Sequence, residues 1–484
     1  MNWRSPLRFL GRLLLVLAVA ELVPGLCSLI YGEMADAAAF AVTAAVTGLS
    51  GLILMLLGRG KSEQLYRREG FLIVVGGWIL ASLFGALPYM LTGSLPHPAD
   101  AIFESASGFT TTGASVMQTI ESNGHGILFW RSFTQWLGGM GIIVLFVALL
   151  PELGAGARFL YKLEVPGPTA EALHPKVHDT AGLLWKIYLG LSAVEAALLM
   201  LAGMNLYDAL THTFSTLSTG GFSPRNTSVA AFGSPWIETI IVVFMILAGA
   251  NFSLYYGLHL RGGFKALLKD PELQIYLAIT FGVSVVISLI LMSSGTYTSG
   301  GRAFLDAIFQ VAGILTTTGF ATADYEVWPN TARILIFSLM FVGGCAGSTA
   351  GGVKIMRFVI GLKASAREAR LMFSPSHIIA VFVGGKTVPE TVVRSVMGFF
   401  FLYFSSWGLG TLLLTVGAPD LETAAGAAIA TLGNIGPGLS AVGPTGNFSF
   451  FAPWQKIVMV VLMWLGRLEV YALVALMTLT FWRR

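Results

Sequence analysis

Charged side chains are scarce in this chain. They make up 11% of its 484 residues, whereas a soluble protein carries about 25%. Hydrophobic residues make up 55%. This balance excludes an ordinary soluble domain and predicts an all-α polytopic membrane protein embedded in the lipid bilayer. The net charge of +4 does not indicate nucleic-acid binding, so we expect no nucleic-acid partner.

Cysteine is nearly absent as well. Cys27 and Cys345 lie in apolar or glycine-rich surroundings, which favours reduced, structural thiols over a disulfide framework or a metal site. The chain contains no G-x-x-x-x-G-K-[ST] phosphate-binding loop, so we expect it to hold no nucleotide or other cofactor. The seven histidines fall mainly in loops or at span ends, without the partner groups that catalysis needs. The sequence therefore argues against an enzyme.

Long apolar runs, in contrast, fill the chain. About twenty apolar residues cross the hydrocarbon core as a helix. Ten segments reach this length: 9–30, 37–57, 71–92, 127–150, 181–203, 236–258, 273–293, 331–360, 391–416 and 454–481. The first follows a basic N-terminus but has no clear small-residue cleavage site, so we interpret it as a retained helix. Four shorter segments, near 99–111, 207–219, 305–317 and 421–433, are predicted to be re-entrant helices.

Basic residues predict the orientation. With the N-terminus inside, all but six of the 29 Lys and Arg residues fall on or near the inner side. The exceptions are Arg467, within the last span, and five outer residues: Arg131, Arg225, Arg302, Arg333 and Lys456. This asymmetry follows the positive-inside rule. It predicts that both termini are cytoplasmic and that the four short segments lie on the outer face.

A similar short sequence motif recurs at the four short segments. In three of them an Asp lies thirteen residues before the Gly of a Thr/Gly turn, and in the fourth Glu422 lies fourteen residues before Gly436. The recurrence of this motif predicts four parallel pseudo-repeats of span, pore helix and span around a central pore, related by an axis along the membrane normal. The predicted units are an N-terminal two-span hairpin at 1–67 and pore repeats at 68–179, 180–271, 272–388 and 389–484.

The Thr/Gly turns suit a cation filter. A ring of backbone carbonyls can replace the water around a cation without fixed charge. Gly permits the unusual dihedrals, and Thr is expected to favour extended backbone. Irregular backbone at membrane depth occurs where it lines a cavity or is buried in protein, although small residues also serve close helix packing. The predicted ligands are the carbonyls of Thr111, Thr112, Gly113, Thr219, Gly220, Gly221, Thr317, Thr318, Gly319, Asn434, Ile435 and Gly436.

The fourth turn departs from the others, because Asn434 and Ile435 replace the Thr pair. The ring should therefore be only pseudo-symmetric. The C-terminal end of each short helix carries about half a negative charge, which favours a monovalent cation at a shared axis. The acids near the helix starts are interpreted as N-caps, and the alternative is a negative vestibule that concentrates cations. These acids are Asp100, Asp208, Asp306 and Glu422.

Two features are candidate gates. Residues 343–352 contain five glycines and should break the predicted span 331–360, leaving an intramembrane loop below the filter. The loop residues proposed for gating are Gly343, Gly344, Gly347, Ser348, Gly351 and Gly352. Close helix packing is the alternative. Arg467 would be an electrostatic barrier to cations, and its alternative is a structural pair with Glu469 or Glu195.

Together these motifs resemble the Trk/Ktr superfamily of potassium transporters, in its TrkH/TrkG type. The match covers essentially the whole chain and rests on 107–113, 215–222, 316–320, 343–352, 431–437 and Arg467. The resemblance implies uptake of K⁺ across the bacterial inner membrane and a homodimer with one pore per protomer. It also implies a cytosolic, TrkA-like regulatory subunit that binds nucleotides and for which the basic segment 363–370 is a candidate dock.

One alternative keeps the same fold. A Na⁺-permeable or proton-coupled cation symporter would need an ionisable group within the spans, and Glu21 or Glu195 could supply it.

Overall fold

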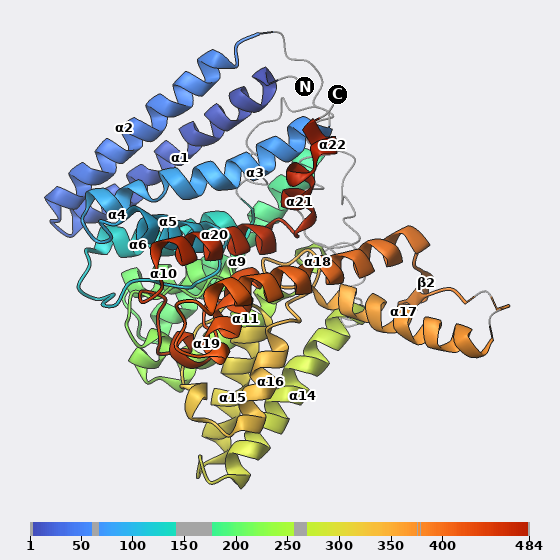
Figure 1. The fold of residues 1–484 in the computed structure, drawn as a ribbon. Helices are drawn as coiled ribbons and strands as arrows, with labels where there is room; N and C mark the ends of the chain where they lie inside the picture. Colours follow the sequence, from blue (N-terminus) through green and yellow to red (C-terminus); the bar gives the residue numbers. More distant parts are fainter. Residues whose placement is uncertain are drawn as a thin grey trace.

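The computed structural model describes residues 3–60, 67–141, 177–255, 269–374, 376–377 and 379–482. Within these ranges the architecture is helical apart from one antiparallel hairpin, β1 (Phe382–Val383) and β2 (Lys386–Thr387), in which Phe382 lies opposite Thr387. The hairpin, the helix before it and the start of the helix after it project together from the remaining helices (Figure 1). The prediction of an all-α polytopic membrane protein is confirmed.

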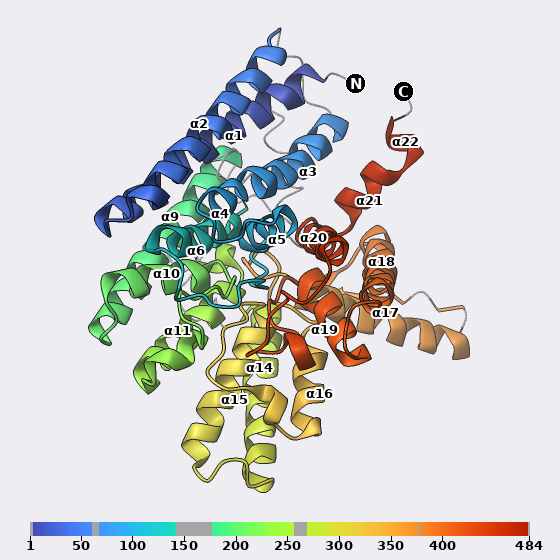
Figure 2. The ribbon, with the colours of Figure 1, turned by 60° about the vertical axis from the view of Figure 1, so that its left-hand side comes forward.

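The helices follow the chain in five groups. The first group is α1 (Arg4–Ile30) and α2 (Met34–Leu57), which lie side by side along one flank (Figure 2). The next two are α3 (Arg67–Phe84), α4 (Leu87–Leu91), α5 (Pro98–Phe109) and α6 (His125–Gly139), then α9 (Val177–Leu201), α10 (Leu206–Leu217), η2 (Ser228–Phe232) and α11 (Pro235–Gly249). The fourth is α14 (Pro271–Ser293), α15 (Gly300–Leu315), η3 (Tyr325–Val327), α16 (Asn330–Leu339) and α17 (Ile355–Phe373). The last is α18 (Glu390–Leu414), α19 (Leu421–Leu432), η4 (Ser440–Val442), α20 (Pro453–Arg467), α21 (Tyr471–Met477) and α22 (Leu479–Trp482).

Six of the described helical segments are long and apolar enough to cross a membrane, and the bent pair α20 and α21 would make a seventh. The other three predicted spans correspond to the shorter helices α6, α11 and α16. The inner ends of the spans predicted at 127–150 and 236–258 lie partly outside the described residues. The boundaries of the five predicted units stay a prediction.

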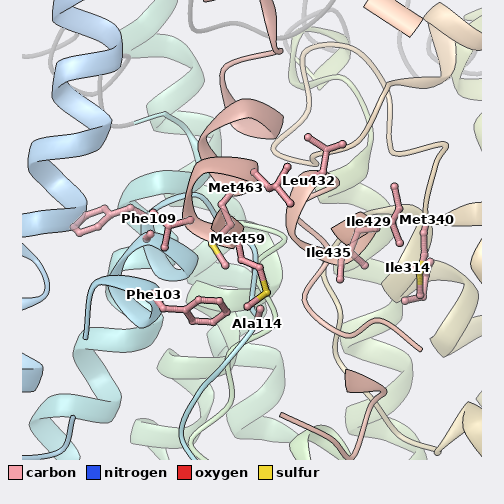
Figure 3. Packing of buried hydrophobic residues seen from close by; sticks show 14 of the residues in the cluster. Phe103, Phe109, Ala114, Ile314, Met340, Ile429, Leu432, Ile435, Met459 and Met463 are labelled. Atoms are coloured by element: carbon pink, nitrogen blue, oxygen red, sulfur yellow. The ribbon is translucent and has the colours of Figure 1, made fainter. Parts of the chain in front are cut away.

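The four short segments form helices of 12 to 16 residues: α5, α10, α15 and α19. At about 1.5 Å per residue they are too short to cross a hydrocarbon core of about 30 Å. They pack into the protein interior. Figure 3 shows Phe103 of α5 beside Met459 of α20, and both side chains are buried. This packing of α5 against α20 joins the first pore helix to the last group of helices.

Two predicted spans are not continuous helices. The segment predicted at 454–481 bends by 117° between α20 and α21, because Glu469 and Val470 have left-handed φ angles of 56° and 59°. Arg467 therefore ends α20 instead of lying in the middle of a straight span, which corrects the sequence interpretation. The segment predicted at 331–360 is helical only to Leu339 and again from Ile355.

Candidate ion pathway

All four short helices end in the same local conformation. The residue after each C-cap is left-handed, with φ angles of 55° at Thr111, 57° at Thr219, 59° at Thr317 and 52° at Asn434. In the first turn, Thr111 N donates to Gly108 O at 3.0 Å and Thr112 N donates to Ser107 O at 2.8 Å. This pair of bonds is the Schellman closure of a helix C-terminus. The expectation of extended backbone at these threonines is wrong, because the closure requires the left-handed region.

A left-handed φ costs a non-glycine residue roughly 1–2 kcal/mol, although Asn tolerates it better than Thr. Three threonines nevertheless adopt it at equivalent positions. Their hydroxyl groups have partners that Gly could not provide. Thr111 Oγ1 accepts a hydrogen bond from Arg467 Nη1 at 3.0 Å, and Thr317 Oγ1 accepts one from Gly351 N at 2.6 Å. Two of the left-handed threonines therefore connect the first turn to Arg467 and the third turn to residues 343–352.

Each turn then meets the next turn through a glycine. We name Gly113, Gly221, Gly319 and Gly436 the glycine ring; all four have positive φ. A Cβ added at these glycines would meet the carbonyl oxygen of Gly220, Thr318, Ile435 and Thr112, respectively, closer than Cβ atoms approach in real proteins. Each contacted carbonyl belongs to the residue before the ring glycine of the following turn, and the fourth contact returns to the first turn. The four turns thus form a closed ring of backbone.

Side chains brace these turns in different ways. In the first and third, hydroxyl pairs hold the backbone, with 2.8 Å between the Oγ1 atoms of Thr110 and Thr112 and 2.7 Å between those of Thr316 and Thr318. In the fourth, Asn434 Nδ2 donates to Thr112 Oγ1 at 2.9 Å. All these side chains are buried. The departure of the fourth turn in sequence therefore leaves its backbone conformation unchanged.

Two cavities adjoin the four turns, and we name them outer and inner after the predicted orientation of the chain. The outer one has a volume of about 100 Å³ and is lined by all four ring glycines together with residues that follow them, such as Phe222 and Pro437. The inner one, of about 50 Å³, is lined by Arg467, Lys354 and several residues of 343–352. Both cavities are large enough for a few water-sized groups.

The glycine-rich loop lies directly below the ring. Gly343, Gly347 and Gly352 are left-handed, with φ angles of 81°, 72° and 70°. Thr349 Oγ1 donates to Leu217 O at 3.0 Å, at the end of α10. A Cβ at Gly351 would meet Gly433 O at the end of α19. Gly344 O accepts from Ile355 N, at the start of α17, at 3.1 Å, and within the loop Ser348 Oγ donates to Cys345 O at 2.6 Å.

Arg467, at the end of α20, contacts both the first turn and the glycine-rich loop. Its Nη1 donates to Thr111 Oγ1 and to Thr349 O, both at 3.0 Å. Its Nη2 donates to Gly138 O at 2.6 Å and to Gly139 O at 2.9 Å, at the end of α6. Glu469 forms an ion pair with Arg357. The guanidinium group therefore joins the first turn, the loop and α6.

The acids near the helix starts are not the N-caps that the sequence suggested. The N-cap residues are His97, Asn205, Ser299 and Asp420. The acids instead form ion pairs: Asp100 with Lys456 and Asp208 with Arg225, both at 2.5 Å, Asp306 with Arg302 at 2.7 Å, and Glu422 with Arg333. The basic partner in each pair is one of the five that the sequence placed outside.

One contact escaped the sequence interpretation. Gln135 contacts the second turn, and no sequence signal marks it. Thr349, within the predicted gate loop, contacts Arg467. Lys354 is buried and lines the inner cavity, as its spacing from the glycine-rich loop indicates. Glu21 and Glu195 are fully buried, and neither lines the two cavities.

Known proteins resemble this chain over its whole length. Residues 36–481 match the TrkH family model, described as a cation transport protein. The chain is 38% identical over 486 residues to the Trk system potassium uptake protein TrkH of Escherichia coli (strain K12), with 100% of both chains covered. It is 38% identical over 422 residues to the TrkG protein of the same organism, covering 87% of this chain and 86% of TrkG. The crystal structure of the potassium transporter TrkH from Vibrio parahaemolyticus matches with a TM-score of 0.89 at 37% identity, covering 100% of both chains.

These relatives are named as transporters, which confirms both the resemblance and the expectation that the chain is not an enzyme. The chain belongs to the TrkH family of cation transport proteins.

Proposed function

We propose that this protein takes up potassium ions through a filter formed by the four turns. The closed ring of backbone carries this proposal, because four equivalent carbonyls meet where four helix C-termini converge. The predicted ligands are the carbonyls of residues 111–113, 219–221, 317–319 and 434–436. The relatives named as potassium uptake proteins support K⁺ as the transported ion.

Residues 343–352 and Arg467 act as the gate in this proposal. Both line the inner cavity, and both contact the left-handed threonines by hydrogen bonds. A cation that leaves the ring would pass close to a guanidinium charge and to the glycine-rich loop. Opening therefore requires the loop and Arg467 to move together, since Arg467 donates to Thr349 O within the loop.

A cytosolic, TrkA-like, nucleotide-binding subunit would drive this movement, and the protein would work as a homodimer in the bacterial inner membrane with both termini in the cytoplasm. The helix α17 supports a docking role, because it follows the loop directly and projects from the other helices together with β1, β2 and the start of α18 (Figure 1). Its basic residues Lys363, Arg367 and Arg370 lie on this projection. Movement of α17 would be transmitted to residues 343–352 through the chain itself.

Isotope flux into liposomes that contain only this chain tests the filter. We expect Rb⁺ to enter faster than Na⁺, and Gly113→Ser or Gly319→Ser to lower the Rb⁺/Na⁺ ratio, because the added side chain would displace the neighbouring carbonyl. Gly282→Ser is the matched control, since a Cβ at this exposed glycine of α14 meets nothing within 4 Å. Unchanged ratios in both ring variants would refute the filter assignment.

The alternative, a Na⁺-permeable or proton-coupled symporter, makes a different prediction. It requires Glu21 or Glu195 to exchange protons during transport. Glu21 accepts a hydrogen bond from Thr47 at 3.2 Å, between α1 and α2, and Glu195 lies on α9. Under the alternative, Glu21→Gln or Glu195→Gln should abolish a pH dependence of uptake. Under our proposal both variants keep the parent's pH profile.

A further inference from the structure

The second turn lacks the hydroxyl side chain that braces the first and third turns. The residue before the ring glycine is Thr112 in the first turn, Thr318 in the third and Ile435 in the fourth, but Gly220 in the second. The threonines use this position for the hydroxyl pairs described above. Gly220 has no side chain for such a bond, so the backbone of the second turn needs another support.

Gln135 of α6 supplies this support from a different repeat. Its Nε2 donates to Gly220 O at 2.7 Å, and its Oε1 accepts from Phe222 N at 3.0 Å. The two bonds lie on either side of Gly221 in the glycine ring. Gln135 is fully buried. A Cβ at Gly220 would overlap the amide group of Gln135, so the glutamine side chain fills the space that the missing side chain leaves.

The bond to Gly220 O also distinguishes this carbonyl from its equivalents. Gly220 O is the oxygen that faces Gly113 in the ring. In the part of the chain that the structure describes, the equivalent oxygens of Thr112, Thr318 and Ile435 accept no such bond. A donor on one side of a carbonyl fixes its direction and withdraws part of its charge from any ion on the other side. One ring oxygen is therefore held more firmly and is a weaker ligand than the other three.

We propose that Gln135 is a specificity-determining residue, which positions the Gly220 carbonyl and thereby sets the preference of the filter for K⁺ over Na⁺. This inference rests on the proposed function of the four turns. Gln135 is a positioning residue, because it acts on the ion through the Gly220 carbonyl. Without it, the second turn can move inward and follow a smaller ion, so discrimination against Na⁺ falls.

Rb⁺ and Na⁺ flux into liposomes containing the purified full chain provides the test. We expect Gln135→Ala to lower the Rb⁺/Na⁺ ratio by about fivefold to tenfold, the size of effect that follows from losing one or two buried hydrogen bonds. Gln135→Met keeps the length of the side chain without either bond, so it should lower the ratio similarly while protecting the fold. Gln455→Ala is the control, because Gln455 is equally buried on α20 but bonds to Leu414 O, away from the ring.

A double variant tests whether Gln135 replaces the missing side chain. Gly220→Thr alone should lose most Rb⁺ flux, because the new Cβ would overlap Gln135. Gln135→Ala combined with Gly220→Thr removes the overlap and restores a threonine that can reach Ser218, as Thr112 reaches Thr110. We expect this double variant to recover a higher ratio than Gln135→Ala, which is a strong departure from additivity.

The outcomes separate the inference from the proposed function. If Gly319→Ser lowers the ratio but Gln135→Ala and Gln135→Met do not, the filter stands and the role of Gln135 is wrong. If none of the three changes the ratio, the filter assignment itself fails. If the double variant has no higher Rb⁺/Na⁺ ratio than Gln135→Ala, then Gln135 does not substitute for the missing side chain.

Discussion

Replacing Arg467 by Ala should raise the flux measured without any regulatory partner. The guanidinium contacts the first turn two residues before its ring glycine, since its Nη1 donates to Thr111 Oγ1 at 3.0 Å. For the estimate we take a separation of about 6 Å between this charge and an ion at the inner edge of the ring. At an effective dielectric constant of about 20, the repulsion at that distance is about 3 kcal/mol. A barrier of this size slows passage by roughly a hundredfold.

The glycine-rich loop limits how much of this hundredfold effect is seen in the measured flux. If residues 343–352 also obstruct the path, removing the charge alone leaves that obstruction in place. The expected rise in Rb⁺ flux for Arg467→Ala is therefore about tenfold to a hundredfold. The freed carbonyls of Gly138, Gly139 and Thr349 act in the same direction, because they would face the cavity as additional cation ligands.

Two further substitutions separate charge from shape. Arg467→Gln removes the charge and keeps much of the side chain, so it should conduct like Arg467→Ala. Arg467→Lys cannot span four acceptors as a guanidinium fork does, but it keeps the positive charge. Its flux should therefore stay near the parent's. The assay is Rb⁺ uptake into liposomes with the protein alone, normalised to the amount of folded protein. Parental flux in both neutral variants would refute the barrier.

Deleting residues 346–350 should also raise unstimulated Rb⁺ flux, and a parental rate would remove the loop from the gate. Glu104→Gln should lower stability by about 3–5 kcal/mol, since it breaks a fully buried ion pair of 2.8 Å with Arg131. The thermal midpoint in detergent measures this loss, and Glu390→Gln, in an exposed pair, should change it little. The backbone N–H of Thr423 donates to the Asp420 carboxylate and lowers its pKa in the folded protein. The carboxylate therefore stabilises the fold above the unfolded pKa of about 4, and this stabilisation is lost as the pH falls through the folded pKa. The parent's advantage in thermal midpoint over Asp420→Ala should shrink over that range, and a constant difference would contradict it.

The amino-acid sequence predicts much of this architecture because its strongest signals are long apolar runs and the asymmetry of basic residues. Both reflect the bilayer as a solvent, and both are local in sequence. It also predicts which residues lie at the turns, because Gly and Thr mark irregular backbone. It could not predict the bend after Arg467, since the segment 468–481 is as apolar as a continuing helix. The left-handed φ angles of Glu469 and Val470 depend on tertiary contacts instead.

The acids near the helix starts show the same limit. Sequence spacing placed Asp100 in the first turn of a helix, where a capping role is the commonest one. Its actual partner, Lys456, lies 356 residues further along the chain. Gln135 is a second example, because its partners belong to another repeat. Contacts between repeats have no local signature, so a single sequence does not reveal them.

The ion pairs decide where the attraction for cations originates. All five outer basic residues contact carboxylates, so the fields of the acids near the helix starts are largely cancelled before they reach the axis. The four helix C-termini are different, because they converge inside the protein where screening is weak. Each carries about half a negative charge, so together they provide about two, of which Arg467 cancels one. Removing Arg467 would therefore raise the net negative charge at the inner end of the ring by about one, whereas Asp100→Asn should leave selectivity unchanged and lower only stability.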